Sequence, residues 1–203
     1  MPRPCLGKST FEISMPLPGN HEWLVTTETG GYDCNGSYDQ YHDNNNYFSI
    51  DFSSGNRADT GATVYNSTSD IPVLAVADGK IIKSEFNSGN GNYVIIDHDE
   101  DGNLNTGFST WYLHFKYLPS VVVGAIVKKG DIIGYMGNTG ISYGTHLHFG
   151  VRYKNNGASS VPELAKVIME GHLLKGYQTE CSLNSKGEPI SPKRYYRSYN
   201  LVY

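Results

Sequence analysis

Two histidines, His146 and His148, stand two residues apart in the apolar run Thr145-His146-Leu147-His148-Phe149-Gly150-Val151. Residues i and i+2 of a β-strand point to the same face, so this run predicts two neighbouring imidazoles, with Leu147 and Phe149 turned into the core. Such a pair can supply a metal ligand and a proton carrier from one strand. Imidazoles are also ordinary groups on a solvated strand face, so the pair alone leaves both interpretations open.

An acidic residue and a third histidine lie upstream of this pair. Residues 47–52 alternate in polarity, so that Asp51 faces away from Ile50 and Phe52. A carboxylate between two core-facing residues is expected at the lip of a pocket, where it can act as a ligand. His42 precedes this strand in a polar loop.

A fourth histidine occurs in the same kind of pattern in residues 110–115. Alternation predicts Tyr112 and His114 on one face of this strand, with Leu113 and Phe115 on the other. The chain therefore offers three strands that each project metal-competent groups from a polar face.

Zinc catalysis is the chemistry that such a set would serve. A catalytic zinc ion takes three protein ligands, for which two histidines and a carboxylate suffice, and keeps its fourth position for water or substrate. The metal lowers the pKa of water and polarises a scissile carbonyl, while an unligated histidine moves protons. The histidines and acids of this chain exceed three, which leaves groups for that second role.

Short strands separated by turns are expected to position these groups. Asp78-Gly79 between two apolar runs predicts a two-residue hairpin, because a type I′ turn needs positive φ at both central positions. Residues 161–170 are the one stretch with helical character, kept short by Pro162 and Gly171. The expected strands are residues 23–27, 47–52, 72–77, 80–85, 93–97, 110–115 and 146–153.

Length and charge limit the classes of protein that remain. A chain of 203 residues can bury the core of one domain, and we expect a single β domain over residues 1–203 with decorated termini. Sixteen Lys and Arg against 20 Asp and Glu give a net charge of -4 without a basic block. This balance predicts no nucleic-acid partner and no anionic bilayer.

Cysteines and apolar runs give further exclusions. Cys5, Cys34 and Cys181 lack Cys-x-x-Cys spacing, which argues against a thiolate zinc site or a redox pair. At most one disulfide can form, and its pairing stays open. The sequence contains no run of 18 apolar residues, so no membrane span is predicted. Met1-Pro2-Arg3-Pro4 does not begin a signal peptide, so a leader is expected to be absent from this chain.

In order along the chain, these residues resemble the lysostaphin-like zinc endopeptidases, the M23 peptidases that cut peptides in bacterial cell walls. The resemblance covers about residues 23–153, and several motifs in the right order are more specific than any one of them. The matching elements are His42 with Asp51, Ile71-Pro72-Val73-Leu74-Ala75-Val76-Ala77-Asp78-Gly79, Gly91-Asn92-Tyr93-Val94-Ile95-Ile96-Asp97-His98, Tyr112-Leu113-His114, Val127-Lys128-Lys129-Gly130-Asp131-Ile132-Ile133-Gly134, Gly137-Asn138-Thr139-Gly140 and His146-Leu147-His148.

Carried over by position, the resemblance implies that His42, Asp51 and His148 bind zinc (Zn²⁺). His114 and His146 would be the unligated pair that orients and deprotonates water and stabilises the developing oxyanion. Eight residues separate His42 from Asp51, more than is commonest in the family, and this longer spacing is similar to the β-lytic and staphylolytic branch. The reserves for the first ligand are Asp43 and His21.

Other polar residues have plainer interpretations. The run Asp97-x-Asp99-x-Asp101-Gly102 copies the first half of a calcium loop, but Phe108 stands where that loop needs a bidentate Glu, so a β-turn between strands is preferred. His21 and His172 are expected to be surface groups. Tyr112 and Tyr143 are weak candidates for the lining of a cleft.

The resemblance implies a zinc-dependent endopeptidase that hydrolyses cross-bridges or stem peptides of bacterial peptidoglycan, at glycine-containing or D-amino-acid-containing bonds. It implies a mainly β fold, an antiparallel β-sandwich (barrel-sandwich hybrid) with irregular N- and C-terminal extensions. We expect a secreted or periplasmic monomer. Two alternatives remain: a catalytically silent M23-like binding domain, and a phosphocarrier-type module, which would leave Asp51 and His42 without a role.

Overall fold

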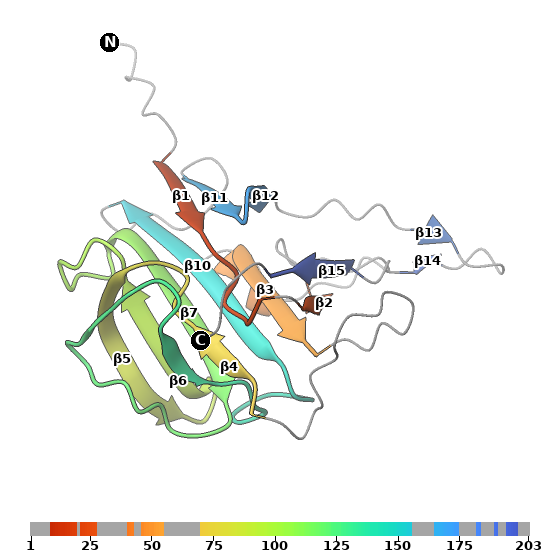
Figure 1. Cartoon of the computed structure of the whole chain (residues 1–203), viewed down its shortest axis with the longest axis horizontal. Coiled ribbons are helices and arrows are strands. Elements are labelled where there is room, and N and C mark those ends of the chain that lie inside the picture. Colours follow the sequence, from red (N-terminus) through yellow and green to blue (C-terminus); the bar gives the residue numbers. More distant parts are fainter. Residues whose placement is uncertain are drawn as a thin grey trace, which may run out of the picture.

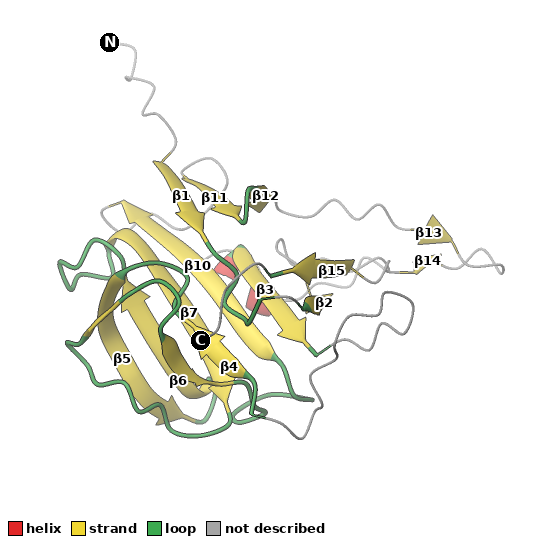
Figure 2. Cartoon of the chain, in the orientation of Figure 1, coloured by secondary structure: helices red, strands yellow, loops and turns green. Residues whose placement is uncertain are grey.

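The computed structural model describes residues 9–19, 21–27, 40–42, 46–54, 70–155, 165–174, 182–183, 189–190 and 194–198. Strands and loops account for nearly all of these residues (Figure 2), and the named helical element is the 3₁₀ turn η1 (Gln40–His42). The strands are β1 (Ser9–Ile13), β2 (Glu22–Thr27), β3 (Phe48–Ser53), β4 (Pro72–Leu74), β5 (Gly79–Asn87), β6 (Gly91–Asp97), β7 (Thr106–Phe115), β8 (Ile126–Val127), β9 (Ile132–Tyr135), β10 (Leu147–Asn155), β11 (Ala165–Met169), β12 (His172–Leu174), β13 (Ser182–Leu183), β14 (Pro189–Ile190) and β15 (Arg194–Arg197).

A large antiparallel sheet forms the centre of the molecule (Figure 1), with the strand order β15-β2-β3-β10-β7-β6-β5-β8. A short antiparallel pair, β4 with β9, lies against this sheet, and a third small sheet has the order β1-β11-β12. The expected antiparallel β-sandwich is therefore confirmed, and each of the seven expected strands is present. One pair departs from the antiparallel rule, because β1 and β11 run parallel.

The hydrophobic core fills the space on one face of the large sheet. Strands β3 and β10 are adjacent in it and alternate as expected, because every second side chain is buried in the core while the others face the opposite side. Val73 of β4, Val94 and Ile96 of β6, and Ile133 of β9 close the same cluster. Its largest fully buried side chains include Trp23, Tyr112, Phe48, Phe52, Phe115 and Phe149.

Described parts of both chain ends belong to this core. Ile13 and Met15 near β1, and Val167 and Met169 in β11, are all buried and belong to the same hydrophobic cluster as the central strands. Strand β15 extends the large sheet by pairing with β2. Segments without strand signals in the sequence are thus ordered by partners that lie far away along the chain.

The hairpin expected at Asp78-Gly79 is wrong. Strand β4 pairs with β9, whereas β5 pairs with β6 and β8, so the chain crosses between sheets at this point. Neither residue has a positive φ. Asp78 instead accepts hydrogen bonds from the backbone of Lys129 (2.9 Å) and Nζ of Lys128 (2.8 Å). A Cβ on Gly79 would lie 2.6 Å from the carbonyl oxygen of Asp97, so glycine is needed here for close packing.

The helix expected over residues 161–170 is also wrong where the structure describes it. Ala165, Val167 and Met169 are buried while Lys166 is exposed, which is the period-2 pattern of strand β11. Pairing with β1 decides between the two structures, and β1 has no signal of its own that would have identified this partner. Residues 161–164 lie outside the described residues.

Two other expectations concern membrane-spanning helices and disulfide bonds. Among the residues that the structure describes, no helix has the length and apolarity required to cross a membrane. Cys5, Cys34 and Cys181 all lie outside the described residues, so their pairing stays open.

If the ends and the centre form one domain, a cavity in β11 must destabilise the whole chain. Met169 is fully buried, and we expect Met169→Ala to lower the free energy of unfolding by about 2–5 kcal/mol in a single transition. Urea unfolding followed by tryptophan fluorescence measures this. Lys166→Ala, on the exposed face of the same strand, is the control and should change stability by about 0.5 kcal/mol or less. A separate early transition in the Met169 variant, with the main one unmoved, would show that the ends fold independently.

Candidate metal centre

Asp51 and His148 are brought together by strand register. They are direct partners across β3 and β10, on the face opposite to the core residues that flank them. Directly opposite residues of an antiparallel pair have their Cβ atoms about 4.5–5.5 Å apart, so their polar groups meet above the sheet. Oδ1 of Asp51 lies 2.9 Å from Nδ1 of His148.

His42 reaches the same place from the 3₁₀ turn η1. Nδ1 of its buried ring lies 2.9 Å from the carbonyl oxygen of Ser49, which makes Nδ1 the protonated donor and Nε2 the unprotonated nitrogen. That Nε2 lies 3.2 Å from Oδ2 of Asp51. The rings of His42 and His148 are 4.9 Å apart between centroids. A carbonyl that fixes the tautomer of a histidine is the usual support of a metal ligand.

The donor set of His42, Asp51 and His148 fits a zinc ion. One ligand atom from each residue lies within 4.8 Å of the other two, and two imidazoles with one carboxylate are a common catalytic zinc set. Oδ1 of Asp51 is buried and accepts no hydrogen bond of suitable geometry in the described structure, which is costly unless a cation neutralises it. Burial alone would raise the pKa of Asp51, but His148 and His42 hold that pKa well below its usual range. The carboxylate is therefore ionised.

His114 is aimed into the site by a bulge in β7. The pairing of β6 with β7 shifts register between Asn92 and Val94, and His114 has a φ of 67°, in the left-handed region. Its Nδ1 donates to the carbonyl oxygen of Thr139 at 2.8 Å, so Nε2 is the unprotonated nitrogen. Burial, with the neighbouring histidines, lowers the pKa of His114 to about 4. The ring is therefore a neutral proton acceptor at neutral pH.

His146 completes the group from the loop that leads into β10. Its Nδ1 donates to the carbonyl oxygen of Gly144 at 2.8 Å, and Oγ of Ser142 lies 3.2 Å from the same nitrogen. Its Nε2 lies 3.8 Å from Oδ1 of Asp51, and its ring centroid is 4.8 Å from that of His114. The two histidines of the late motif thus face one carboxylate, as their spacing in the sequence predicts.

The facing expected for residues 112–115 is wrong for two of them. Tyr112 is fully buried, packs on Phe149 at 5.4 Å and accepts a hydrogen bond from the backbone of Val76, so it does not line the cleft. Leu113 lines the cleft beside His114 instead. The bulge inserts an extra residue at this point, which places two successive side chains on the same face.

An open cleft of about 500 Å³ surrounds these groups. Tyr143, which the sequence suggested, stands fully exposed at its edge. The cleft also contains Arg152, whose guanidinium lies 3.5 Å from the centre of the Trp111 ring and donates to Asn46 at 2.5 Å. Burial lowers the pKa of Arg152 to about 10, within the range where it stays charged. Sequence reasoning missed Arg152, although its position four residues after His148 on one strand places both on the same face.

The remaining candidates lie away from the cleft or outside the described residues. His21 contacts the ring of Trp23 at 6.1 Å, and His172 is exposed on β12. The ring of His98 is held by the carbonyl of Asp78 and the hydroxyl of Thr110, both at 2.7 Å. Asp43 lies outside the described residues.

The sequence model of peptidase family M23 matches residues 57–161, about half of the 203-residue chain, and the chain belongs to this family. The matched region includes His114, His146 and His148. His42 and Asp51 precede it, so their place in the site depends on the geometry given above.

Similar proteins include a peptidoglycan endopeptidase and lysostaphin. The peptidoglycan DD-endopeptidase ShyC of Vibrio cholerae is 44% identical over 78 residues, which are 38% of this chain and 16% of ShyC. Lysostaphin of Staphylococcus simulans is 42% identical over 81 residues, 38% of this chain and 15% of that protein. The chain therefore spans less than a fifth of either relative.

Among solved structures, the deep-sea M23 metalloprotease pseudoalterin has a similar fold. Its TM-score is 0.51 at 20% identity, over 92% of this chain and 98% of that one. At this identity the likeness concerns the fold alone.

The lowered pKa of His114 gives a pH dependence to the metal-free protein. An unfolded histidine titrates near about 6.5, whereas folded His114 titrates at about 4, so the unfolded chain binds more protons between these values. The free energy of unfolding therefore falls as the pH is lowered from about 6.5 to 4, by at most about 3 kcal/mol from this residue. We expect urea unfolding at a series of pH values to show a flatter profile for His114→Gln. The exposed control His172→Gln should keep the parent slope, and coincident profiles for parent and His114→Gln would contradict the assignment.

Proposed function

We propose that this chain is a zinc-dependent endopeptidase that hydrolyses peptides of bacterial peptidoglycan. The observation that carries the proposal is the convergence of two imidazoles and a carboxylate beside two further imidazoles at an open cleft. Family membership and the activity named for ShyC support the same substrate class. Its site of action would be outside the cytoplasm, and we propose a monomer of one domain over residues 1–203.

His42, Asp51 and His148 would hold the metal through Nε2, the carboxylate and Nδ1. A bound zinc ion supplies Lewis acidity, which polarises a peptide carbonyl and makes water a better nucleophile at neutral pH. Asp51 contributes the negative charge of the set, and the Ser49 carbonyl fixes the ring of His42. His42 is preferred to His21 as the first metal ligand, because His21 lies away from the cleft.

His114 and His146 would move the protons of the reaction. Neutral His114 can accept a proton from the attacking water at Nε2, because its Nδ1–H is already donated to Thr139. His146 presents Nε2 toward the carboxylate of Asp51 at 3.8 Å, with its ring centroid 4.8 Å from that of His114. Once protonated, either ring can donate to the developing oxyanion or to the leaving amine. The fixed Nδ1 contacts keep both Nε2 atoms directed at the substrate.

The bond that is cut is expected to carry little side-chain bulk or to contain D-amino acids. A flexible glycine-containing bridge would suit this cleft, because two of the residues that would hold the metal, Asp51 and His148, lie on strands of the sheet. The relatives are named for different bonds. ShyC is a DD-endopeptidase, whereas ALE-1 of Staphylococcus capitis, 39% identical over 79 residues (38% of this chain and 20% of ALE-1), is a glycyl-glycine endopeptidase. Both kinds of bond therefore remain substrates to test.

Replacement of one ligand and one proton carrier separates metal binding from catalysis. We expect His148→Ala to lose zinc and activity, because a two-ligand site binds weakly, and His114→Ala to keep zinc while activity falls at least about 100-fold. Metal content by atomic emission and turbidity loss of purified cell walls measure these outcomes. His172→Ala, on the exposed face of β12, is the matched histidine control and should retain both. Retention of metal and activity in both test variants would place the site elsewhere.

The products of wall digestion test the substrate class. After digestion of purified peptidoglycan by the zinc-loaded protein, we expect mass spectrometry to show new amino termini at glycine or at a cross-linked stem-peptide residue. Soluble sugars without new amino termini would exclude a peptidase. Phosphate transfer to a histidine from a phosphorylated donor protein, without bound metal, would support the phosphocarrier alternative instead.

A further inference from the structure

A second cluster of carboxylates lies in the connection between β6 and β7. Asp97 is the last residue of β6, and Asp99 and Asp101 follow it in the loop. One carboxylate oxygen from each lies within 4.8 Å of the other two. The β-turn interpretation of this segment explains a reversal of the chain, but it does not explain why three acids should gather at one point.

Asp97 supplies an independent sign that the cluster holds a cation. Its side chain is fully buried, and Oδ2 accepts the backbone N–H of Gly102 at 2.7 Å. Its Oδ1 is also buried but has no hydrogen-bond donor among the described residues. Among the described residues, the second buried side-chain oxygen without a hydrogen-bond partner is Oδ1 of Asp51, in the candidate zinc site. A buried carboxylate oxygen without a donor is unfavourable unless a positive charge meets it.

The loop fixes the other carboxylates in a defined geometry. Gly102 has a φ of 80°, at the position where a calcium loop uses glycine for its sharp turn. Oδ1 of Asp101 accepts the backbone N–H of Asn103 at 2.6 Å, and Oδ2 accepts the hydroxyl of Thr106 at 2.9 Å. Asp99 stands between Asp97 and Asp101 in the chain, and its carboxylate lies within 4.8 Å of theirs, so three negatively charged groups are crowded at one point.

We propose that Asp97, Asp99 and Asp101 bind a calcium ion. Three carboxylates without histidine or cysteine form an all-oxygen set, which favours a hard cation over zinc. Calcium accepts six to eight oxygen ligands in irregular geometry, whereas magnesium demands a near-ideal octahedron and gives up its waters reluctantly, so a cluster of protein carboxylates favours calcium. Asp99 and Asp101 are exposed, so water can complete the coordination shell.

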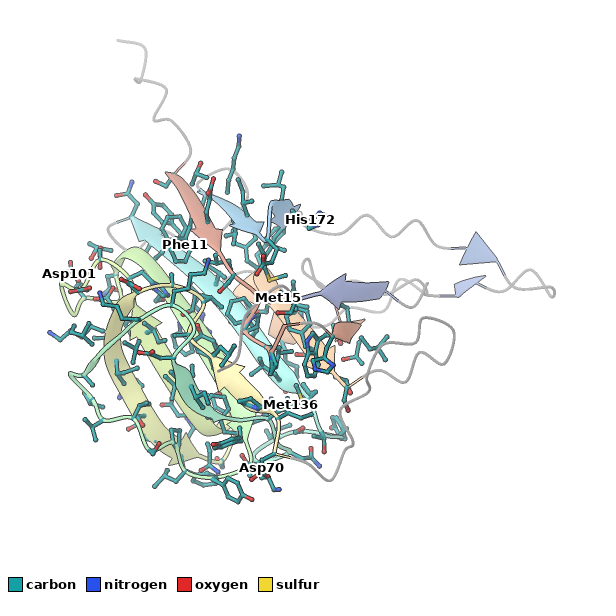
Figure 3. The ribbon with its side chains drawn as sticks, viewed as in Figure 1. Phe11, Met15, Asp70, Asp101, Met136 and His172 are labelled. Carbon is teal, nitrogen blue, oxygen red and sulfur yellow. The ribbon has the colours of Figure 1, made fainter. Side chains whose placement is uncertain are left out.

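The proposed calcium site is separate from the candidate metal centre. The loop joins the start of β7, whereas His114 lies near the end of that strand, eight residues later. Asp97 pairs with Ser109, five residues before His114, so at about 3.3 Å per residue the two sites are about 16 Å apart along the strand. Figure 3 shows Asp101 at the far end of the sheet from Asp70, which binds Lys116 directly after β7. The inference therefore does not depend on the proposed peptidase activity.

The affinity expected for this site is modest. Phe108 occupies the position of the bidentate Glu and packs on Phe11, with ring centroids 4.7 Å apart, so no carboxylate closes the shell from that side. Calcium modules of low affinity have dissociation constants of about 10⁻⁴–10⁻³ M. An ion bound here would tie the end of β6 to its loop, and its effect would be on the stability of the β6–β7 hairpin.

Calorimetric titration of the zinc-loaded protein with calcium chloride, together with thermal unfolding, tests the proposal. About 5 mM calcium should raise the melting temperature by about 2–4 °C. We expect Asp99→Asn and Asp101→Asn, both at exposed positions, to weaken calcium binding at least about tenfold while wall digestion in excess zinc is unchanged. Asp131→Asn, an exposed acid of another turn, is the matched control and should bind calcium like the parent.

Three results would overturn the proposal. They are the absence of binding heat and of a melting shift, a shift that persists in the double variant Asp99→Asn/Asp101→Asn, and an equal shift with sodium chloride at matched ionic strength. The ligand variant His148→Ala should still bind calcium, even if the chain proves to have no peptidase activity. Loss of calcium binding in that variant would place the ion at the other centre.

Discussion

The carboxylate of Asp51 is the constraint on which the candidate site depends. It is held above the sheet because its two neighbours in β3, Ile50 and Phe52, are locked into the core, and it meets His148 because β3 and β10 pair in one register. A slip of one residue would turn every one of these side chains to the opposite face. The same apolar contacts that stabilise the sandwich thus place an ionised group against imidazoles, where a cation is the natural partner.

The bulge in β7 turns two successive side chains, Leu113 and His114, toward the cleft, which regular strand pairing would not allow. In an ideal strand, Leu113 and His114 would face opposite sides of the sheet, and one of them would enter the core. The register shift and the positive φ of His114 bring both to the cleft while Tyr112 and Phe115 remain buried. Backbone strain at this point is sustained by the hydrogen bond from the His114 backbone N–H to Asn90 at 3.0 Å and by the contact with Thr139.

The sequence alone predicts the features that depend on the local alternation of polar and apolar residues. The strands of the large sheet and the inward facing of Leu147 and Phe149 follow from a period of two, and the structure confirms them. Local patterns do not predict pairings between distant segments, so the sequence predicts a helix over residues 161–170, where β11 forms, and a hairpin at Asp78-Gly79, where the chain crosses between sheets. They also do not locate the bulge at Leu113, because an extra residue in a strand is decided by its neighbours. The convergence of His42 with Asp51 likewise depends on a loop whose path local patterns do not encode.

Donor chemistry distinguishes the candidate metal centre from the carboxylate cluster that follows β6. Oδ1 of Asp51 and Oδ1 of Asp97 are equally deprived of hydrogen-bond donors, yet imidazoles surround the first and carboxylates the second. Imidazole nitrogens favour zinc and leave neighbouring rings for proton transfer, while an all-oxygen set favours a hard ion that has no such chemistry. Since β7 lies between them, one strand would be fixed by an ion at its start and would carry the proton acceptor His114 near its end. An ion at the start of β7 could then support the strained backbone at His114 only through the strand itself and its neighbours. The pairing of β7 with β10 is continuous, and its pairing with β6 is interrupted only at the bulge.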